Sequence, residues 1–309
     1  MHRHEKHLLR FFGPTFLLPT LTLDGLQKYV NQRSKVKTHY GSPVSAATIH
    51  KELVTLGTVW RWAERLKLVN GSFPRRGVRL PKQDELPPFQ TWDEIDRQIE
   101  QGGLNEAQAA VLWDALYLRK SEVDDLIAHV KQHALHAFIY PMVVMAAHTG
   151  ARRSELMRSQ RLDFNLEGSN VTIREKKRVK GRDTTRRVPM SPTFKTAITA
   201  WFEEEHPGGP LTFCHGRRSS RSRCKATNAE PLTNDQAHDR LERTLKDSKW
   251  EKIKGWHCLR HSFISNLASQ GIDQRIIDDF VGHTTEQMRR RFRHLFPDVK
   301  QAAINAVFG

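Results

Sequence analysis

Three short segments, far apart in the chain, carry residue types that can hold an anion. They are residues 148–156 (HTGARRSEL), 256–261 (WHCLRH) and 281–283 (VGH). In the second segment His257, Arg260 and His261 are spaced i, i+3 and i+4, so a helix would place all three on one face. Because crowded cations repel one another, an anion bound between them is the natural explanation of this spacing.

The first segment predicts an arginine at the start of a helix. An apolar helix is expected to stop at Thr149-Gly150, and Arg152 then enters the next turn with its guanidinium projecting. Taken alone, such a segment is more often a helix cap followed by a surface charge, and a lone histidine is more often structural. A functional site is therefore indicated only by the order and spacing of all three segments together.

Two domains are expected to position these segments. Residues 1–86 are predicted to be helical, with a helix-start signal at Ser42-Pro43. Apolar residues then recur on one stripe of a long helix: Ile49, Leu53, Leu56, Trp60 and Ala63. A polar, proline-containing connection over residues 81–88 marks the boundary, and residues 87–309 are predicted to be mainly helical with a small β-sheet.

Within the second domain, helical patterns begin near Thr91 and continue to Leu118, and again from Leu126 to His148. Two short β-favouring runs follow on either side of the basic residues 176–183, and together they are expected to form a long, basic hairpin. The runs are Val171–Glu175 and Thr185–Met190. Ser191-Pro192 is predicted to start a helix that ends near Glu205.

The C-terminal third predicts two further helices. Asp273 can cap the first, Gly282 suits its left-handed end, and the inward side chains are expected to be Ile276, Ile277, Phe280 and Val281. Thr284 with Gln287 forms a capping-box pattern for the second. Its apolar stripe is Met288, Phe292 and Leu295. A short apolar stretch, residues 302–308, would gain stability by docking on another surface.

The composition favours a polyanionic partner. The 309 residues include 50 Lys and Arg against 34 Asp and Glu, a formal net charge of +16. Such a surface favours nucleic acid, because each neutralised phosphate releases a condensed counterion. No apolar run approaches the roughly 18 residues of a membrane-spanning helix, and no export signal is recognised. We therefore expect a cytoplasmic protein with no membrane partner.

The cysteines predict neither a disulfide framework nor a metal site. Three widely spaced cysteines suit a reducing cytosol. Cys214, His215, Cys224 and His238 share one polar stretch, but no paired C-x-x-C accompanies them, so we expect no zinc there.

The order T-G-x-R-x-x-E-L, basic β-hairpin, H-x-L-R-H, then G-H and a C-terminal helix resembles the tyrosine recombinase (phage integrase) family over residues 90–300. Residues 47–63 are similar, less specifically, to the family's core-binding domain. The resemblance implies a helical core-binding domain that binds DNA, joined to an α+β catalytic domain of the integrase type. It further implies site-specific cleavage and rejoining of DNA through a 3′-phosphotyrosine intermediate, without a metal or cofactor.

The resemblance also implies roles for individual residues. Arg152 and Arg260 match the two catalytic arginines, whose guanidinium forks bind the nonbridging oxygens of a phosphodiester. His257 matches the first histidine of the second segment, and His283 the later histidine or tryptophan. A histidine in such a site can accept the nucleophile's proton or orient the phosphate.

The hairpin lysine, which in this family protonates the departing 5′ oxygen, has two candidates. Lys180 fits when residues are counted back from the second strand, and Lys177 fits when they are counted forward from the first. The predicted hairpin is a few residues longer than usual, so both counts cannot hold. We prefer Lys180.

The sequence departs from the family at the nucleophile. Phe292 lies nine residues beyond His283, where the family has its tyrosine, and it keeps the ring without the hydroxyl. The four tyrosines lie upstream and match no nucleophile position: Tyr29, Tyr40, Tyr117 and Tyr140. We therefore expect DNA binding without cleavage. A deliberate Tyr→Phe change is favoured over natural loss, because decay would erode the phosphate-binding residues too; both origins remain open.

The expected partner is duplex DNA with inverted half-sites, bound by a dimer at each site and a tetramer in the synapse. The resemblance implies that the protein belongs to a mobile genetic element and associates with a prokaryotic nucleoid. Two other functions stay open: a non-enzymatic DNA-binding regulator on the same scaffold, and a type IB topoisomerase. A regulator needs no hydroxyl at position 292, and a topoisomerase would act with little sequence preference.

Overall fold

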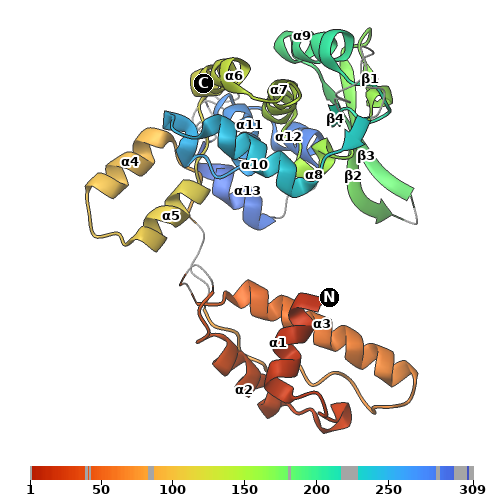
Figure 1. The fold of residues 1–309 in the computed structure, drawn as a ribbon. Coiled ribbons are helices and arrows are strands. Elements are labelled where there is room, and N and C mark those ends of the chain that lie inside the picture. The colour runs from red at the N-terminus through yellow and green to blue at the C-terminus, as the bar shows by residue number, and fades with distance from the viewer. Residues whose placement is uncertain are drawn as a thin grey trace. The chain divides into compact units, whose positions relative to one another are not determined.

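The chain folds into two compact units, Met1–Glu85 and Leu86–Gly309, each with its own hydrophobic core (Figure 1). This computed structural model describes residues 2–38, 41, 43–82, 87–179, 182–216, 229–282, 286–295 and 305. The described chain is mainly helical with few strands, which confirms the predicted fold class.

The first unit is helical. Its elements are α1 (His2–Phe12), the short 3₁₀ helix η1 (Leu18–Thr20), α2 (Leu23–Arg33) and α3 (Ala46–Arg65). The predicted apolar stripe on α3 is confirmed, since all five of its side chains are buried. The predicted helix start is wrong: α3 begins at Ala46, where the Ser45 hydroxyl accepts a hydrogen bond from the backbone N–H of Thr48 (3.2 Å). Pro43 instead pairs with Lys37 in an isolated β-bridge, and Ser42 lies outside the described residues.

A buried polar cluster ties α2 to α3 inside this core. The Tyr29 hydroxyl donates to Glu52 Oε2 (2.6 Å), and Arg33 Nη2 donates to Glu52 Oε1 (2.9 Å). Burial, followed by the hydrogen bond to Glu52, raises the pKa of Tyr29. Because the Glu52 carboxylate satisfies both donors, the cluster is stable as a set and costly to break.

The second unit is built around a nearly apolar central helix, α7. The α-helices of this unit, in order, are α4 (Trp92–Glu100), α5 (Glu106–Asp114), α6 (Lys120–His133), α7 (Ile139–Thr149), α8 (Arg153–Leu156), α9 (Pro192–Ala200), α10 (Asn234–Leu245), α11 (His257–Ser269), α12 (Gln274–Val281) and α13 (Glu286–Phe292). Helices α6, α9 and α11 pack against α7, which explains why almost every side chain of α7 is buried.

The helical pattern predicted from Leu126 to His148 is two helices rather than one. Helix α6 ends at His133, and α7 starts at Ile139, two residues before Pro141. Proline has no backbone N–H and is tolerated only in the first turn of a helix. The chain must therefore leave the helix before Ile139 and begin a new one there.

The sheet of the second unit is small and antiparallel, in the order β1-β2-β3 (Figure 1). Its strands are β1 (Phe164–Asn165), β2 (Asn170–Val179) and β3 (Arg182–Pro189), and a separate pair is formed by β4 (Cys214–Gly216) and β5 (Ala229–Pro231). The predicted hairpin is confirmed, with Val171 opposite Val188. Both strands are longer than the predicted runs, because β2 continues to Val179 past an irregularity between Arg174 and Arg178, and β3 begins at Arg182.

The remaining helix ends agree largely with the sequence. Helix α9 continues through a π-helical turn, η3 (Trp201–Glu205), and so ends at Glu205 as predicted. The 3₁₀ turns η2 (Arg161–Asp163), η4 (Lys249–Lys252) and η5 (Arg293–Leu295) complete the unit. Among the described residues, no helix combines the length and apolar character needed to cross a bilayer.

The C-terminal helices confirm one predicted cap and correct one predicted face. Asp273 Oδ1 accepts a hydrogen bond from the backbone N–H of Arg275 (2.8 Å) at the start of α12. Ile277 and Val281 are buried, whereas Ile276 is 46% exposed and does not face inward as predicted. Thr284 lies outside the described residues, as does the stretch 302–308 apart from residue 305.

Candidate active site

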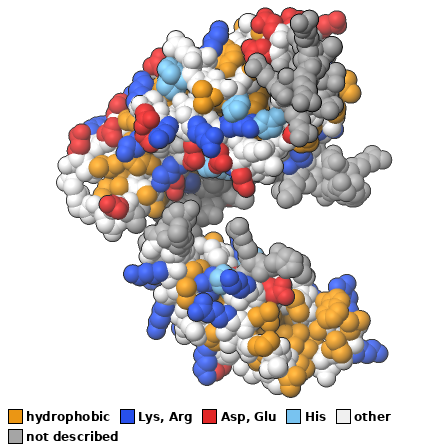
Figure 2. Space-filling view, in the orientation of Figure 1, with side chains coloured by type: hydrophobic (Ala, Val, Ile, Leu, Met, Phe, Trp, Pro, Cys, Tyr) orange, Lys and Arg blue, Asp and Glu red, His pale blue; other side chains and the backbone are white. Residues whose placement is uncertain are grey.

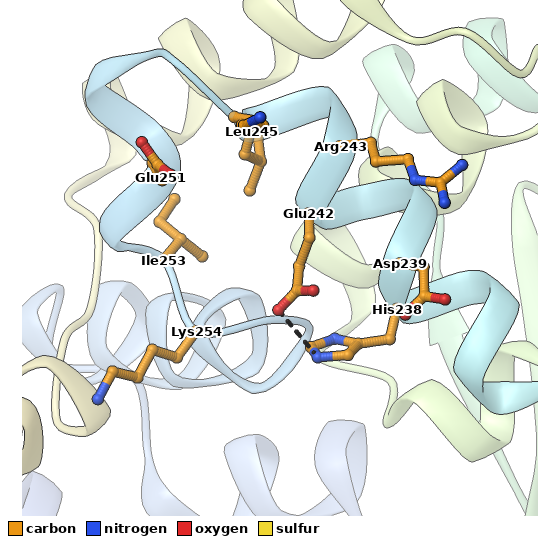
Figure 3. A pocket seen from close by; sticks show the side chains of 9 residues that line it. His238, Asp239, Glu242, Arg243, Leu245, Glu251, Ile253 and Lys254 are labelled. Carbon is orange, nitrogen blue, oxygen red and sulfur yellow. Dashed lines mark ion pairs between the residues drawn. The ribbon is translucent and has the colours of Figure 1, made fainter.

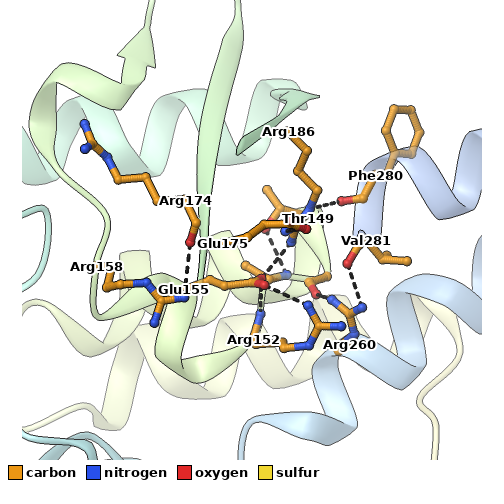
Figure 4. Close-up of polar contacts among 12 residues, drawn as sticks. Thr149, Arg152, Glu155, Arg158, Arg174, Glu175, Arg186, Arg260, Phe280 and Val281 are labelled. Atoms are coloured by element: carbon orange, nitrogen blue, oxygen red, sulfur yellow. Dashed lines mark hydrogen bonds and ion pairs between the residues drawn. The ribbon is translucent and has the colours of Figure 1, made fainter. Parts of the chain in front are cut away.

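The guanidinium of Arg260 joins all three segments that the sequence singled out. Arg260 lies on α11 and is 5% exposed. Its Nη1 donates to the Gly150 carbonyl (2.6 Å) at the end of α7, and its Nη2 donates to the Val281 carbonyl (2.7 Å) at the end of α12 (Figure 4). A guanidinium has five N–H groups, so three of them have no recipient among the described residues and are available to a ligand.

Arg260 is a buried cation with no directly bonded carboxylate in the described part of the chain. Burial, and next the charge of Arg152, lower the pKa of Arg260 to about 9, so it stays charged at neutral pH. A buried charge without a direct counterion is unfavourable, and a bound anion would offset that cost. The position of Arg260 therefore favours an anionic ligand.

Arg152 is held beside Arg260 by a buried carboxylate. Arg152 caps α8, and Glu155 accepts its backbone N–H at Oε2 (2.8 Å) and its Nη1 at Oε1 (2.8 Å). Arg186 Nη2 also donates to Glu155 Oε2 (2.7 Å). Burial opposes ionisation of Glu155, but the bonds and charges of the two arginines outweigh it and lower its pKa. The Arg152 side chain keeps 36% of its surface exposed, so it can reach a ligand from solvent.

Arg186 connects this carboxylate to the hairpin and to α12. Its Nε donates to the Phe280 carbonyl (2.6 Å), and its Nη1 donates to Glu175 Oε1 (3.2 Å). Thr184 Oγ1 donates to the other oxygen of Glu175 (2.7 Å). We call Arg152, Glu155, Glu175, Arg186 and Arg260 the arginine network (Figure 4).

Sequence reasoning assigned no role to Glu155 or Arg186, although signals for both were present. Glu155 lies three residues after Arg152, which is the spacing of a capping box. Arg186 lies two residues before the buried Val188, on the same face of β3. Strand periodicity therefore indicates that Arg186 points inward, where a cation requires a partner.

Glycine is required at both ends of this network. Gly150 has φ +61°, and a β-carbon there would lie 2.7 Å from the Phe263 ring. Gly282 has φ +72°, and a β-carbon there would overlap Glu175 Oε1. These positive φ angles, together with the close approach of neighbouring side chains, explain the glycine in each motif.

His257 lies within electrostatic reach of Arg152 and Arg260, whereas His261 packs against Phe89. Partial burial, then Arg260 and Arg152, lower the pKa of His257, so its imidazole is neutral at neutral pH and can accept a proton. His261 instead lies against the Phe89 ring, 4.2 Å between centroids, and burial lowers its pKa to about 3. His261 also stacks with His257, 6.1 Å between ring centroids, and an anion shared by the three side chains stays a prediction.

Phe292 is fully buried at the end of α13. Its ring stacks on Phe89 at 4.3 Å and belongs to a hydrophobic cluster with Val281, the neighbour of Gly282. Lys180 and His283 lie outside the described residues, and Lys177 falls within β2. The structure therefore brings Arg152, Arg260 and His257 together and places position 292 in the adjacent core.

The tyrosines that the structure describes each have other contacts. Tyr29 is bonded to Glu52 in the first unit, and Tyr140 lies beneath the Lys131 ammonium (5.6 Å). Tyr117 shares the cluster of Phe292, but burial and Glu94 raise its pKa, which is the opposite of what a phenolate nucleophile needs. Tyr40 lies outside the described residues.

A hollow of about 660 Å³ elsewhere in the second unit is separate from this chemistry (Figure 3). It is lined by side chains of both charges from α10, Lys246, η4 and the two residues after η4. Among them is His238, whose Nε2 lies 3.0 Å from Glu242. None of its lining residues belongs to the arginine network. Among the described residues, no group of three or more His, Cys, Asp or Glu could hold a metal ion, and Cys224 lies outside them.

Basic side chains also lie on the surface around both cores. Figure 2 shows Lys and Arg side chains on the visible faces of the first and second units, with acidic side chains interspersed mainly on the second. With a formal net charge of +16, these surfaces favour contact with a polyanion. The described chain is thus mainly helical, and its second unit contains a network of buried and partly buried arginines.

The comparison with known families identifies the class of this fold. The Phage integrase family model matches residues 117–298, which is more than half of the chain. The chain therefore belongs to the phage integrase family. The resemblance found in the sequence is thus confirmed, and the matched region contains every segment of the arginine network.

Relatives and solved structures agree with this assignment. Tyrosine recombinase XerA of Pyrococcus furiosus is 29% identical over 192 residues, covering 60% of this chain and 61% of the relative. Tyrosine recombinase XerC of Treponema denticola is 23% identical over 260 residues, covering 82% of this chain and 74% of the relative. The chain thus spans about three fifths of the XerA relative.

Two structures described as DNA complexes show the same fold. XerH site-specific recombinase bound to palindromic difH substrate has a TM-score of 0.61 at 17% identity, covering 97% of this chain and 76% of that one. A Tyr→Phe variant of the Tn1549 transposon integrase with transposon right end DNA has a TM-score of 0.66 at 14% identity, covering 100% and 92%.

Proposed function

We propose that this chain binds duplex DNA site-specifically and holds one backbone phosphate between Arg152 and Arg260. The observation that carries the proposal is the buried Arg260 guanidinium, which is fixed by two carbonyls and has three N–H groups left over. A phosphodiester supplies the negative counterion that the Arg260 guanidinium lacks among the described residues. Family membership, the net charge of +16 and the DNA complexes of the structural neighbours support the choice of DNA.

The proposed reaction is that of a tyrosine recombinase. The two guanidinium groups would bind the nonbridging oxygens and stabilise the charge that develops on them in the transition state. The neutral His257 would accept the proton of the attacking phenol, or orient the phosphate, and Lys180 would protonate the departing 5′ oxygen. With a tyrosine at position 292, the attack would leave a 3′-phosphotyrosine that preserves the phosphodiester energy for rejoining.

With Phe292, this reaction stops at binding, because no hydroxyl is present to attack. We propose that the phenylalanine is a deliberate Tyr→Phe change, since the phosphate-binding residues around it are intact. We further propose that two protomers bind inverted half-sites, with a tetramer in the synapse, and that residues 1–86 form a core-binding domain that contacts DNA. Phosphate contacts would position the protein, while base contacts would give it sequence preference.

A non-enzymatic DNA-binding regulator is the second candidate. It is favoured by one observation, the complete burial of Phe292, which packs as a core residue. The two candidates differ in what a tyrosine at position 292 would do: a disabled recombinase would regain covalent attachment to DNA, and a regulator would not.

The test compares the chain as written with Phe292→Tyr. Each is incubated with a nicked, end-labelled duplex, and covalent adducts are separated on a denaturing gel. A 3′-linked adduct with Phe292→Tyr alone supports the proposal. Phe89→Tyr is the matched control, because it puts a hydroxyl on the ring that stacks against position 292 (4.3 Å). An adduct with the chain as written, or binding without any adduct in Phe292→Tyr, would contradict the recombinase proposal.

A further inference from the structure

Phe89 lies where the chain enters the second unit, and its ring packs against Phe292. The second unit begins at Leu86, and Phe89 is 0% exposed. Its ring is stacked on Phe292 with centroids 4.3 Å apart and an angle of 24° between the planes, and it also touches His261 (4.2 Å). The packing of residue 292 therefore depends on a segment 200 residues earlier in the chain.

The contact extends beyond the two rings. The Arg291 guanidinium lies 3.8 Å from the centroid of the Phe89 ring, and Arg291 Nε donates to the Pro87 carbonyl (2.9 Å). His294 Nε2 lies 2.9 Å from the Phe89 carbonyl, and the Phe89 N–H donates to the Arg291 carbonyl (3.4 Å). We call residues 87–89 the linker end. It contacts α13 and η5 on both sides of position 292.

Gln90 fixes the point at which the linker end leaves the core. Its N–H donates to the Ala115 carbonyl (3.1 Å), and its carbonyl accepts from the Tyr117 N–H (2.9 Å). Residues 87–89 lie between this anchor and the boundary of the first unit. The linker end is therefore the described part of the second unit that follows the first unit most directly in the chain, and it contacts α13.

The other side of α13 is attached to α12. Arg289 Nη2 lies 2.7 Å from Asp278 Oδ2, and α12 ends at Val281, whose carbonyl accepts from Arg260. Residue 292 is thus positioned from two directions: by the arginine network through α12, and by the linker end through Phe89.

We propose that the linker end is a positioning element for residue 292 and couples its placement to the engagement of the first unit with DNA. Phe89 acts as a positioning residue through its stacked ring, and Arg291 keeps the linker end against α13. This regulation rests on the proposed function, because the signal it transmits is DNA binding. In a chain with tyrosine at position 292, the same coupling would make placement of the nucleophile depend on DNA bound by the first unit.

The test observes position 292 directly. The full chain carries 4-fluorophenylalanine at position 292, and its ¹⁹F resonance is recorded with and without a mixed-sequence duplex of DNA at low salt. Arg291→Gln removes the cation from the Phe89 ring and the bond to Pro87. Arg290→Gln is the matched control, since the Arg290 side chain is 70% exposed and its recorded contact is with Glu286 on its own helix. Binding of each variant is measured by fluorescence anisotropy.

We expect the duplex to shift the ¹⁹F resonance in the parent chain and in Arg290→Gln. In Arg291→Gln we expect no shift, although its dissociation constant for DNA stays within about twofold of the parent's, a change of roughly 0.4 kcal/mol. A purely structural role for Arg291 would not remove a DNA-dependent shift at unchanged affinity. An equal shift in Arg291→Gln, or none in a parent chain that binds DNA, would overturn the coupling alone. Failure of every variant to bind would overturn the proposed function and the coupling with it.

A second variant extends the test to reaction rate. Phe89→Leu in the Phe292→Tyr chain removes the stacked ring but keeps an apolar side chain. We expect single-turnover adduct formation to slow by about tenfold, as a barrier increase of about 1.4 kcal/mol would produce, with DNA affinity unchanged. Equal rates in the two chains would contradict a positioning role for Phe89.

Discussion

Replacing Glu155 tests whether the arginine network is held together by its buried carboxylate. Glu155 is 2% exposed and accepts three hydrogen bonds, two from Arg152 and one from Arg186, whose side chain is 7% exposed. Removing one partner of such a buried pair costs about 3–5 kcal/mol, because the remaining charge stays buried. Glu155→Ala should therefore destabilise the second unit by roughly that amount.

The magnitude can be read as a melting temperature. For a domain of 150–250 residues, each kcal/mol lowers the midpoint by about 2–4 °C, so Glu155→Ala should lower the calorimetric transition of the second unit by roughly 6–20 °C. Glu242→Ala is the control, since Glu242 forms an exposed pair with His238 and is 56% exposed. Pairs of that kind contribute about 0–1 kcal/mol.

The effect should also depend on pH. The pKa of Glu155 is lowered from its ordinary value of 4.5, so the folded state binds the proton less readily than the unfolded state. The stabilisation is present above pH 4.5 and is lost as the pH falls through the lower, folded pKa. The difference between parent and Glu155→Ala should therefore shrink in acid. A change below about 1 kcal/mol at pH 7, equal to that of an exposed pair, would refute the reasoning.

Three further outcomes are expected. Gly282→Ala should lower the calorimetric midpoint, because the added β-carbon would overlap Glu175 and the backbone φ of +72° costs a non-glycine residue about 1–3 kcal/mol. An unchanged midpoint would contradict this expectation. His261→Leu should be less sensitive to acid in urea unfolding at pH 7 and pH 5. The parent His261 has a pKa of about 3 against 6.5 ordinarily, so its stabilisation is complete above 6.5 and falls by up to about 1.4 kcal/mol per pH unit below it; parallel losses in both chains would argue otherwise. Arg152→Ala should weaken DNA binding and reduce the slope of log affinity against log salt by about 0.9, the value of one phosphate contact, and an unaltered slope would exclude that contact.

Local patterns in the sequence predicted the elements better than their contacts. The α3 stripe at Ile49 and Trp60 was predictable because one helix period determines which side chains share a face. The start of α3 was mispredicted because two serines, Ser42 and Ser45, both precede a helical pattern, and only the fold selects which of them caps it. The hairpin strands were predicted too short because polar and basic residues continue along them to Val179.

The sequence singled out Arg152, His257 and Arg260, which the structure brings together, but it did not reveal the groups that hold them in place. Arg152, His257 and Arg260 were identified by spacing, but the partner of Arg260 is backbone carbonyl, which carries no sequence signal. The bond from Arg186 to Glu155 joins residues 31 positions apart, so it follows from the packing of β3 against α8. The stacking of Phe89 on Phe292 depends similarly on tertiary structure.

The claim on which this account depends is that Arg152 and Arg260 act on the same phosphate. The most direct measurement replaces single phosphates of a bound duplex, one at a time, with neutral methylphosphonate and measures binding by the parent, by Arg152→Ala and by Arg260→Lys, which keeps the charge but loses the fork. We predict that one phosphate in each half-site, once neutralised, makes both variants bind as tightly as the parent. The coupling energy between that phosphate and each arginine should be about 0.5–3 kcal/mol. Losses that couple to two different phosphates, or to none, would contradict the claim.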